Sequence, residues 1–449
     1  MSAWYDNSVF YHMYPLGMTG APKENREEQT EGRFGQLDAW IPHIKELGAS
    51  AIYIGPLFES TTHGYDTRDF RLVDRRLGTN EDFRKFVSLC HESGIRVVVD
   101  SVFNHTGREF FAFRDIQKKR DGSPYRDWYK NVNFWQSSPL GDSFTYEAWQ
   151  GHYELAALNL RNPSVRDYLL DAVSFWVQEF DIDGIRLDCA NVLDFDFMKA
   201  LRSHCDRLKP EFWLMGEVIH GDYSRWANES MLHSVTNYEL HKGLYSGHND
   251  YNCFEIAHTI RRQSQQNGGI YRNINLYTFV DNHDEDRIMS KLKNKNHITT
   301  VYTMLFTLPG IPSIYYGSEW GIDGARTPYC DDMLRPAISP DQFPEYHTGL
   351  TDCIARLARI HKAHPALCTG TYRELFLTNR QYAFCRSSEN EHIITAVNID
   401  DGDADLSFSL PMEGSRTVDL QTGENLLIEN NHLSLHLAGC ESKILEIVG

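Results

Sequence analysis

Four short segments of the chain place a carboxylate or a histidine directly after an apolar run that is typical of a β-strand. They span residues 98–105, 183–188, 212–217 and 279–284, and they carry Asp100, Asp188, Glu217 and Asp284. In a parallel α/β barrel, the carboxyl ends of the strands expose their side chains to one common pocket. Several carboxylates in one pocket suit the cleavage of a glycosidic bond, in which one carboxylate attacks and a second donates a proton.

The elements that would position these segments alternate regularly along the chain. Short β-branched runs are followed by longer amphipathic stretches, which is typical of repeated strand–helix units. Helices are predicted over residues 36–47 and, with Asn80 as the N-cap, over residues 81–93. We expect eight strands, over residues 9–14, 51–54, 96–102, 184–187, 213–216, 234–236, 276–280 and 313–316. The fold class expected is therefore α/β, a (β/α)8 TIM barrel.

Two parts of the chain do not follow this alternation. Residues 106–158 are polar and aromatic, and they are too many for a structureless loop, which predicts a small subdomain inserted after the third strand. After residue 365, alternating segments predict a C-terminal antiparallel β-sandwich. The domains expected are a barrel of residues 1–105 and 159–365, an inserted subdomain B of residues 106–158, and a β-sandwich of residues 366–449.

The composition excludes several classes of partner. The 449 residues carry a formal net charge of -18, which argues against nucleic acid and against an anionic membrane. The N-terminus has no basic and apolar leader, so we expect a cytoplasmic location. Nine scattered cysteines without a C-x-x-C pair predict neither a disulfide framework nor a zinc–cysteine site. Nothing in the sequence indicates the oligomeric state.

The four segments resemble the signatures of the α-amylase family, glycoside hydrolase clan H. All four signatures occur in the family's order along this chain. The first two lie at residues 100–105 and 184–188, and the third and fourth are Gly216-Glu217 and Asn282-His283-Asp284. Supporting matches are His63-Gly-Tyr65-Asp66 and the stretches 158–163 and 310–319. Asn191, three residues after Asp188, makes the chain similar to the cyclomaltodextrinase and neopullulanase branch.

There are departures from that branch. Because the barrel is expected to start at about residue 8, we expect none of the separate N-terminal domain that often forms dimers there, and the fourth signature is closer to that of α-amylases. Glu217 is followed by Val218-Ile219-His220, without the tryptophan that is common in that branch.

The resemblance implies a role for each candidate site residue. Asp188 would be the nucleophile, Glu217 the acid/base, and Asp284 a third carboxylate that binds sugar hydroxyls and distorts the ring. Arg186 would hold Asp188 ionised and oriented. The remaining substrate-binding candidates are Tyr65, Asp66, His105 and His283.

Structural alternatives stand beside these roles. Asp100 and Asn104 could satisfy backbone groups of a tight loop, Arg186 and Asp188 could form a purely structural ion pair, and Asp183-Gly184 is more often a turn than a site. Glu217 is harder to explain structurally, because a buried carboxylate costs several kcal/mol unless it is used or paired.

We expect that the enzyme requires no cofactor, and the sequence leaves open whether it binds calcium. Asn104 matches a residue that binds calcium in many α-amylases, and the alternative is a hydrogen-bonding role in its loop. The insertion offers Asp115, Asp121 and Asp127, but no compact calcium loop.

The resemblance implies a retaining glycoside hydrolase that cleaves α-1,4 glucosidic bonds in maltooligosaccharides, cyclodextrins or related α-glucans, with α-1,6 bonds left open. The alternatives are a glucanotransferase or sugar phosphorylase on the same scaffold, an endo-acting starch α-amylase, and an inactive sugar-binding homologue. The last would be expected to lose a catalytic carboxylate, and Asp188, Glu217 and Asp284 are all present. A metal-dependent barrel hydrolase would carry His-x-His after the first strand, where His12-Met-Tyr14 supplies one histidine.

Overall fold

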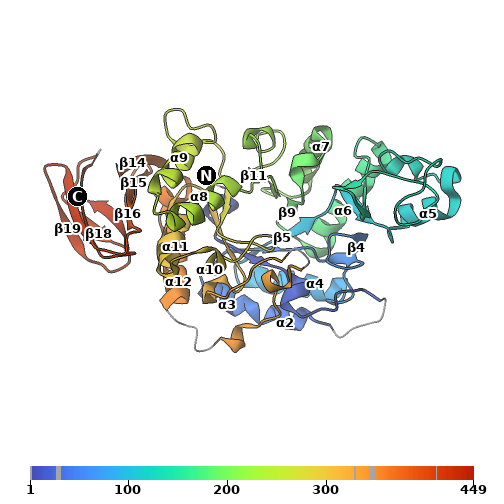
Figure 1. Cartoon of the computed structure of the whole chain (residues 1–449), viewed down its shortest axis with the longest axis horizontal. Coiled ribbons are helices and arrows are strands. Elements are labelled where there is room, and N and C mark those ends of the chain that lie inside the picture. The colour runs from blue at the N-terminus through green and yellow to red at the C-terminus, as the bar shows by residue number, and fades with distance from the viewer. Residues whose placement is uncertain (1–2, 27–31, 328–329, 344–348, 411) are drawn as a thin grey trace.

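A computed structural model describes residues 3–26, 32–327, 330–343, 349–410 and 412–449. A barrel of strands and helices occupies the middle of the molecule, an inserted segment projects at one end, and a β-sheet formed by the C-terminal residues lies at the other (Figure 1). Within the described residues, no helix is long and apolar enough to cross a membrane.

Eight parallel strands form the barrel, as the sequence predicts. Their order is β11-β10-β9-β5-β2-β1-β13-β12, and a parallel bridge between Thr236 and Tyr277 links the two ends. The strands are β1 (Phe10–Met13), β2 (Ala51–Ile54), β5 (Arg96–Ser101), β9 (Gly184–Leu187), β10 (Trp213–Gly216), β11 (Ser234–Val235), β12 (Tyr277–Phe279) and β13 (Ile311–Tyr315).

The interior of the barrel is a packed core. It takes side chains such as Phe10, Tyr53, Val98, Trp213 and Tyr277 from five different strands. Because apolar side chains fill the interior of the barrel, the polar side chains gather at the carboxyl ends of the strands.

Helices cover the outside of the barrel, and two boundaries differ from the prediction. The helix expected over residues 36–47 is two helices, α2 (Phe34–Asp38) and α3 (Trp40–Glu46), because Pro42 has no N–H to continue the hydrogen bonding across the junction. The other helices are α1 (Pro15–Met18), α4 (Asn80–Glu92), α6 (Pro163–Phe180), α7 (Phe195–Leu208), α8 (Tyr238–Asn249), α9 (Cys253–Ser264), α10 (Ile288–Lys291), α11 (Ile298–Thr307), α12 (Gly349–Ala363) and α13 (Pro365–Thr369).

The N-cap of α4 is Thr79, so the prediction of Asn80 is wrong by one residue. The Thr79 hydroxyl accepts from the Asp82 N–H at 3.2 Å, and the Asp82 carboxylate accepts from the Thr79 N–H at 2.8 Å. The Asn80 side chain instead accepts from the Val73 N–H, so it terminates a neighbouring strand.

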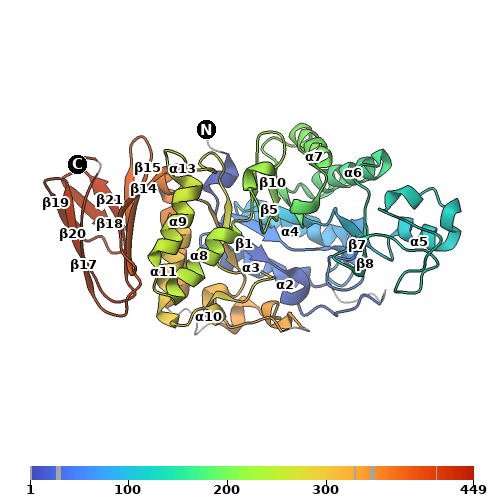
Figure 2. The same cartoon turned by 45° about the horizontal axis from the view of Figure 1, so that its top comes forward.

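Two segments beside the barrel mouth complete the frame of the site. The hairpin β3 (Phe58–Ser60) and β4 (Thr67–Val73) carries the loop that contains Tyr65. After β5, the insertion forms a sheet of β6 (His105–Gly107), β8 (His152–Ala157) and β7 (Ala148–Trp149), with α5 (Phe111–Lys119) beside it (Figure 2). The expected insertion is thus confirmed as a small folded unit.

The C-terminal segment is an antiparallel sheet of eight strands that folds back on itself. In spatial order the strands are β14 (Thr371–Leu377), β15 (Gln381–Ser387), β16 (His392–Asn398), β21 (Ser442–Val448), β18 (Arg416–Asp419), β19 (Asn425–Glu429), β20 (His432–Leu437) and β17 (Ala404–Ser409). The rings of Phe376 on β14 and Phe408 on β17 lie 6.2 Å apart although these strands stand at opposite ends of the order, which makes two layers. The expected sandwich is confirmed; the prediction did not contain β14, β18 and β19.

Candidate active site

Arg186 connects three carboxylates at the barrel mouth. This side chain on β9 is 3% exposed. Its Nη1 donates to Asp100 Oδ1 at 2.9 Å and to Asp188 Oδ1 at 3.0 Å, and its Nη2 lies 2.9 Å from Glu217 Oε2. The three acids follow or end β5, β9 and β10, so the strand ends bring together groups that are far apart in the sequence. A buried cation with three acidic partners offsets part of their mutual repulsion.

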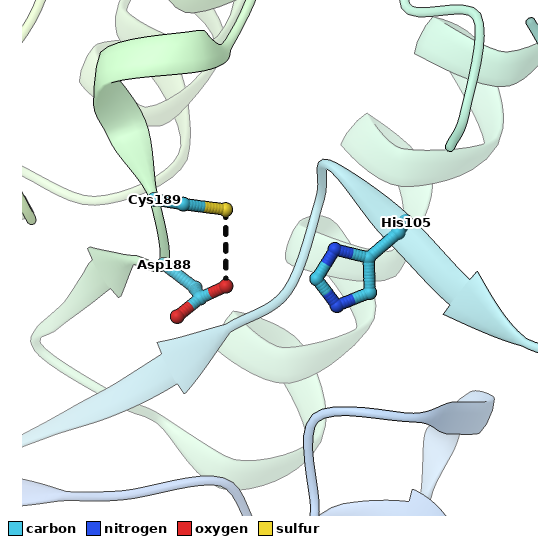
Figure 3. A group of neighbouring side chains, drawn as sticks. All are labelled: His105, Asp188 and Cys189. Carbon is cyan, nitrogen blue, oxygen red and sulfur yellow. Dashed lines mark hydrogen bonds between the residues drawn. The ribbon is translucent and has the colours of Figure 1, made fainter. Parts of the chain in front are cut away.

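Asp188 and Glu217 differ in their remaining partners. Asp188 Oδ2 accepts from the Cys189 thiol at 3.1 Å (Figure 3), so both Asp188 oxygens accept a hydrogen bond. Glu217 Oε2 accepts from the Cys189 N–H at 2.9 Å as well as facing Arg186, whereas Oε1 has only the Tyr238 hydroxyl at 3.5 Å. Glu217 therefore has one oxygen that is free to carry a proton.

The carboxyl cluster holds a proton near neutral pH. Burial raises the pKa of Asp188 to about 8; Arg186 opposes this rise, and the charges of Glu217 and Asp100 add to it. Asp188 and Glu217 therefore share one proton near neutral pH, which is the electrostatic arrangement of an acid and nucleophile pair.

Asp284 lies in a more positive environment. Burial alone would raise its pKa, but His283 and Arg335 hold the pKa of this carboxyl well below its usual value. Arg335 Nη2 donates to Asp284 Oδ1 at 3.0 Å, and His283 Nε2 lies 3.0 Å from Oδ2. Asp284 is therefore a fixed anion at neutral pH.

Aromatic side chains enclose this part of the cleft. The Tyr65 ring stacks on His283 at 5.8 Å and 14°, and its hydroxyl donates to Asp100. His105 is buried, and its ring stacks beside Trp149 at 6.3 Å. Burial lowers the pKa of His105 to about 3, so this histidine is neutral and can both donate and accept hydrogen bonds.

These groups open into one cavity of about 450 Å³. Its lining contains most of the predicted residues together with others that the sequence analysis did not single out for the site, such as Trp149, Cys189, Asp331 and Arg335. Asp331 and Arg335 lie in the segment after β13, which carries no acidic signature at a strand end to draw attention to them.

The structure does not bring Asp66 to this cleft. Its carboxylate accepts from the Thr62 N–H at 3.0 Å and from the Thr62 hydroxyl at 2.8 Å, and it faces a neighbouring cavity. Asp66 therefore shapes the loop that holds Tyr65.

Asp100 and Asn104 both have structural partners. Asp100 is 1% exposed and accepts from Tyr53 and Arg186. The Asn104 amide nitrogen lies 3.2 Å from His105 Nδ1, so Asn104 orients that ring. Both side chains therefore contact other side chains of the site rather than backbone groups of a tight loop.

The candidate metal ligands of the site already have protein partners. Asp115 is engaged by Ser123 and Lys119, so it does not join Asn104 in an oxygen-rich cage. One ligand atom each of His105, Asp188 and Cys189 does lie within 4.8 Å of the others (Figure 3). This group coincides with the carboxyl cluster, where Arg186 already supplies the positive charge.

The fold and the carboxyl cluster together define a glycoside hydrolase of the barrel type. The family described as alpha amylase, catalytic domain, matches residues 25–359. The chain therefore belongs to the alpha-amylase family, and it is an enzyme of the glycosidase class.

Curated relatives of this chain carry the names of particular enzymes within the family. A cyclomaltodextrinase from a Bacillus species is 31% identical over 434 residues, which cover 89% of this chain and 74% of the relative. An intracellular maltogenic amylase of Bacillus subtilis is 33% identical, with 73% of this chain and 58% of the relative covered.

Solved structures of enzymes superpose on nearly the whole of this chain. A cyclomaltodextrinase superposes with a TM-score of 0.87 at 26% identity and covers 99% of this chain and 78% of its own. A debranching enzyme of Nostoc punctiforme superposes with a TM-score of 0.84 at 26% identity over 98% of both chains.

Proposed function

We propose that the protein hydrolyses α-glucosidic bonds with retention of configuration, with Asp188 as the nucleophile and Glu217 as the acid/base. The observation that carries the proposal is the asymmetry around Arg186. Both oxygens of Asp188 accept hydrogen bonds, which favours the carboxylate, while Glu217 Oε1 is left to carry the shared proton. A nucleophile has to be ionised and an acid protonated at the same pH.

The chemistry then runs in two steps. Asp188 attacks the anomeric carbon as Glu217 protonates the departing glycosidic oxygen, which forms a covalent glycosyl-enzyme. Glu217 next removes a proton from water, and this water displaces Asp188 from the sugar. Two inversions leave the α-configuration.

The other residues would bind the reacting sugar. Asp284 is a permanent anion that can accept from two hydroxyls and stabilise the positive charge that develops on the ring. His105 and His283 would donate to hydroxyls, and Tyr65 offers an aromatic face to the apolar side of the sugar. Cys189 would position both catalytic carboxyls, through its thiol and its N–H.

We further propose α-1,4-linked maltooligosaccharides and cyclodextrins as substrates, with α-1,6 bonds as secondary ones. The curated relatives support this choice, since they include enzymes named cyclomaltodextrinase, maltogenic amylase and neopullulanase. One relative is named an intracellular maltogenic amylase, which supports a cytoplasmic location.

A product profile tests the reaction class. The enzyme is incubated with maltoheptaose, β-cyclodextrin, pullulan and soluble starch, each alone, with glucose added as acceptor, and with inorganic phosphate. Hydrolysis predicts maltose and glucose in all three conditions. Products longer than the substrate in the presence of glucose would identify a glucanotransferase, glucose 1-phosphate formed only with phosphate would identify a phosphorylase, and no turnover of any substrate would indicate an inactive homologue.

A further inference from the structure

A second group of potential metal ligands lies where the barrel meets the C-terminal sheet. His297 directly precedes α11, Asp401 lies in the turn between β16 and β17, and Cys440 lies in the turn between β20 and β21. A ring nitrogen of His297, a carboxylate oxygen of Asp401 and Cys440 Sγ all lie within 4.8 Å of one another. Helix α11 packs along β16 at this junction, so the group bridges the barrel and the C-terminal sheet (Figure 1).

His297 has a nitrogen that nothing in the described part of the chain satisfies. Its side chain is 0% exposed, and Nε2 lies 2.9 Å from the Ile399 carbonyl oxygen. A carbonyl only accepts, so Nε2 carries the hydrogen and Nδ1 keeps a lone pair. Nδ1 is buried and has no hydrogen-bond partner among the described residues. Metal-ligating histidines usually donate one ring N–H to such an acceptor and bind the ion through the other nitrogen, so Nδ1 is the atom through which His297 would bind an ion.

Asp401 is oriented by two neighbours. The Asn294 amide donates to Oδ1 at 2.8 Å and the Tyr251 hydroxyl donates to Oδ2 at 2.9 Å. Each oxygen keeps a second lone pair, and ligating carboxylates are commonly held by such outer hydrogen bonds. Asp401 is exposed and Cys440 is half-buried, so an ion can enter from solvent.

We propose that His297, Asp401 and Cys440 form a zinc site that clamps the C-terminal sheet to the barrel. Imidazole, thiolate and carboxylate together favour Zn²⁺ over Ca²⁺ or Mg²⁺, which prefer oxygen ligands only. Zinc–ligand bonds of 2.0–2.3 Å separate tetrahedral ligands by roughly 3.3–3.6 Å, so a small inward rotation of exposed side chains completes the geometry. Water fills the fourth position, and the Cys440 thiol loses its proton to solvent as the Zn–S bond forms.

Cobalt binding tests the site directly. Co²⁺ added to the metal-free full-length protein should give a thiolate-to-metal absorption in the near ultraviolet, and Zn²⁺ should abolish it by displacement. Cys440→Ser should remove this absorption, whereas Cys330→Ser, which changes an exposed cysteine outside the group, should leave it unchanged. Tyr251→Phe keeps the ring but removes the hydroxyl on Asp401, so it should weaken Zn²⁺ binding about 10-fold.

Thermal unfolding supplies the second measurement. Zn²⁺ should raise the Tm of the parent protein and of Cys330→Ser but not that of Cys440→Ser, because an ion that binds only the folded state stabilises it. No thiolate absorption in the parent protein, or an absorption that survives Cys440→Ser, would overturn the proposal. None of these readouts depends on glycosidase activity, so the site and the proposed reaction succeed or fail separately.

Discussion

At the scale of single residues, the shared guanidinium of Arg186 makes the roles of Asp188 and Glu217 separable by mutation. Asp188→Asn removes the attacking oxygen but keeps the side-chain shape, so turnover of maltoheptaose should fall on the order of 10⁴-fold or more while the fold persists. Proton NMR on the parent enzyme should show the α-anomer as the first product. A folded variant with near-normal turnover, or a β-anomer released first, would assign the chemistry differently.

The same variant has a predicted effect on stability. Because burial raises the pKa of Asp188 to about 8, the folded carboxyl cluster keeps the proton that Asp188 and Glu217 share. The unfolded chain releases the Asp188 proton near the ordinary value of 3.8, so the parent protein loses stability as pH rises between these two values. Asp188→Asn lacks this titration. Its Tm relative to that of the parent should therefore climb from pH 4 to pH 8 and then level off. Differential scanning calorimetry measures the Tm of the parent and of the variant at each pH. Parallel Tm profiles across this range would contradict the assignment.

Glu217→Gln should separate proton donation from nucleophilic attack. The variant should bind sugar but lose the basic limb of the pH–rate profile, since the proton whose release causes that limb is gone. An α-glucosyl fluoride needs no protonation of its leaving group, so it should retain far more of its turnover than maltoheptaose does. If both substrates suffer equally, the acid is another residue.

The sequence could predict which side chains gather only where a signature marked a strand end. Asp188, Glu217 and Asp284 follow apolar runs, so the sequence predicts that they converge on one pocket. Arg335 carries no such mark, because its position depends on how the segment after β13 folds back over the mouth. Asp66 adjoins Tyr65 in the sequence, yet the loop turns its carboxylate to Thr62, and only the local hydrogen bonding decides that direction.

At the scale of elements, Asp183 ties the amino-terminal ends of two barrel strands to the helices that cover them. It is 2% exposed and accepts from His91 of α4 at 2.7 Å and from Arg96 and the Val97 N–H of β5 at 2.9 Å. The sequence suggested only a turn at Asp183-Gly184, because partners more than 80 residues away cannot be inferred from a dipeptide.

Asp183→Asn should therefore destabilise the barrel without touching the cleft. Burial opposes ionisation, but His91, the Val97 N–H and Lys209 lower the pKa of Asp183 to about 2. The difference from the ordinary value corresponds to about 2 kcal/mol of stability. This stability is present above pH 4 and is lost as pH falls toward 2, so urea titrations should show the largest loss at neutral pH and little difference from the parent near pH 2. An equal difference at both values would mean that the charge is not responsible.

The sequence predicts whether a segment is a helix or a strand better than it predicts where that helix or strand begins and ends. The strands β2, β9 and β10 have the predicted limits, and each is followed directly by a glycine or a carboxylate, namely Gly55, Asp188 and Glu217. The hairpin β3–β4 was not predicted, since its strands mix charged and apolar residues and are stabilised by packing on the insertion and α6. Two helix boundaries differ from the prediction because Pro42 lacks an N–H and because Thr79 exchanges two hydrogen bonds with Asp82. A hydrophobic pattern does not register either effect.

At the scale of the whole molecule, the insertion borders the barrel mouth, where Trp149 and Leu155 line the cleft. Asn104 orients His105, and Asp115 pairs with Lys119, so neither is held ready for calcium. We therefore expect the enzyme to keep most of its activity after EDTA treatment, and adding CaCl₂ should not change its Tm. A large loss of activity that calcium, but not zinc, restores would show that the insertion does bind calcium.

The dimensions of the cleft and the family relatives together predict a preference for short or cyclic substrates. A cavity of about 450 Å³ between the insertion and the barrel lies in the range of small-molecule sites, and its walls are formed by Trp149, Leu155, Ile219 and Arg335. A polymer would gain efficiency only from contacts beyond this cavity, since remote subsites contribute binding energy to the transition state. We expect kcat/KM for β-cyclodextrin and maltohexaose to exceed that for soluble starch at least 10-fold per molecule, with maltose and glucose as the main end products. Chromatography of early time points checks both statements. A clear preference for amylopectin, with long maltodextrins appearing first, would instead identify an endo-acting α-amylase whose binding groove extends well past this cavity.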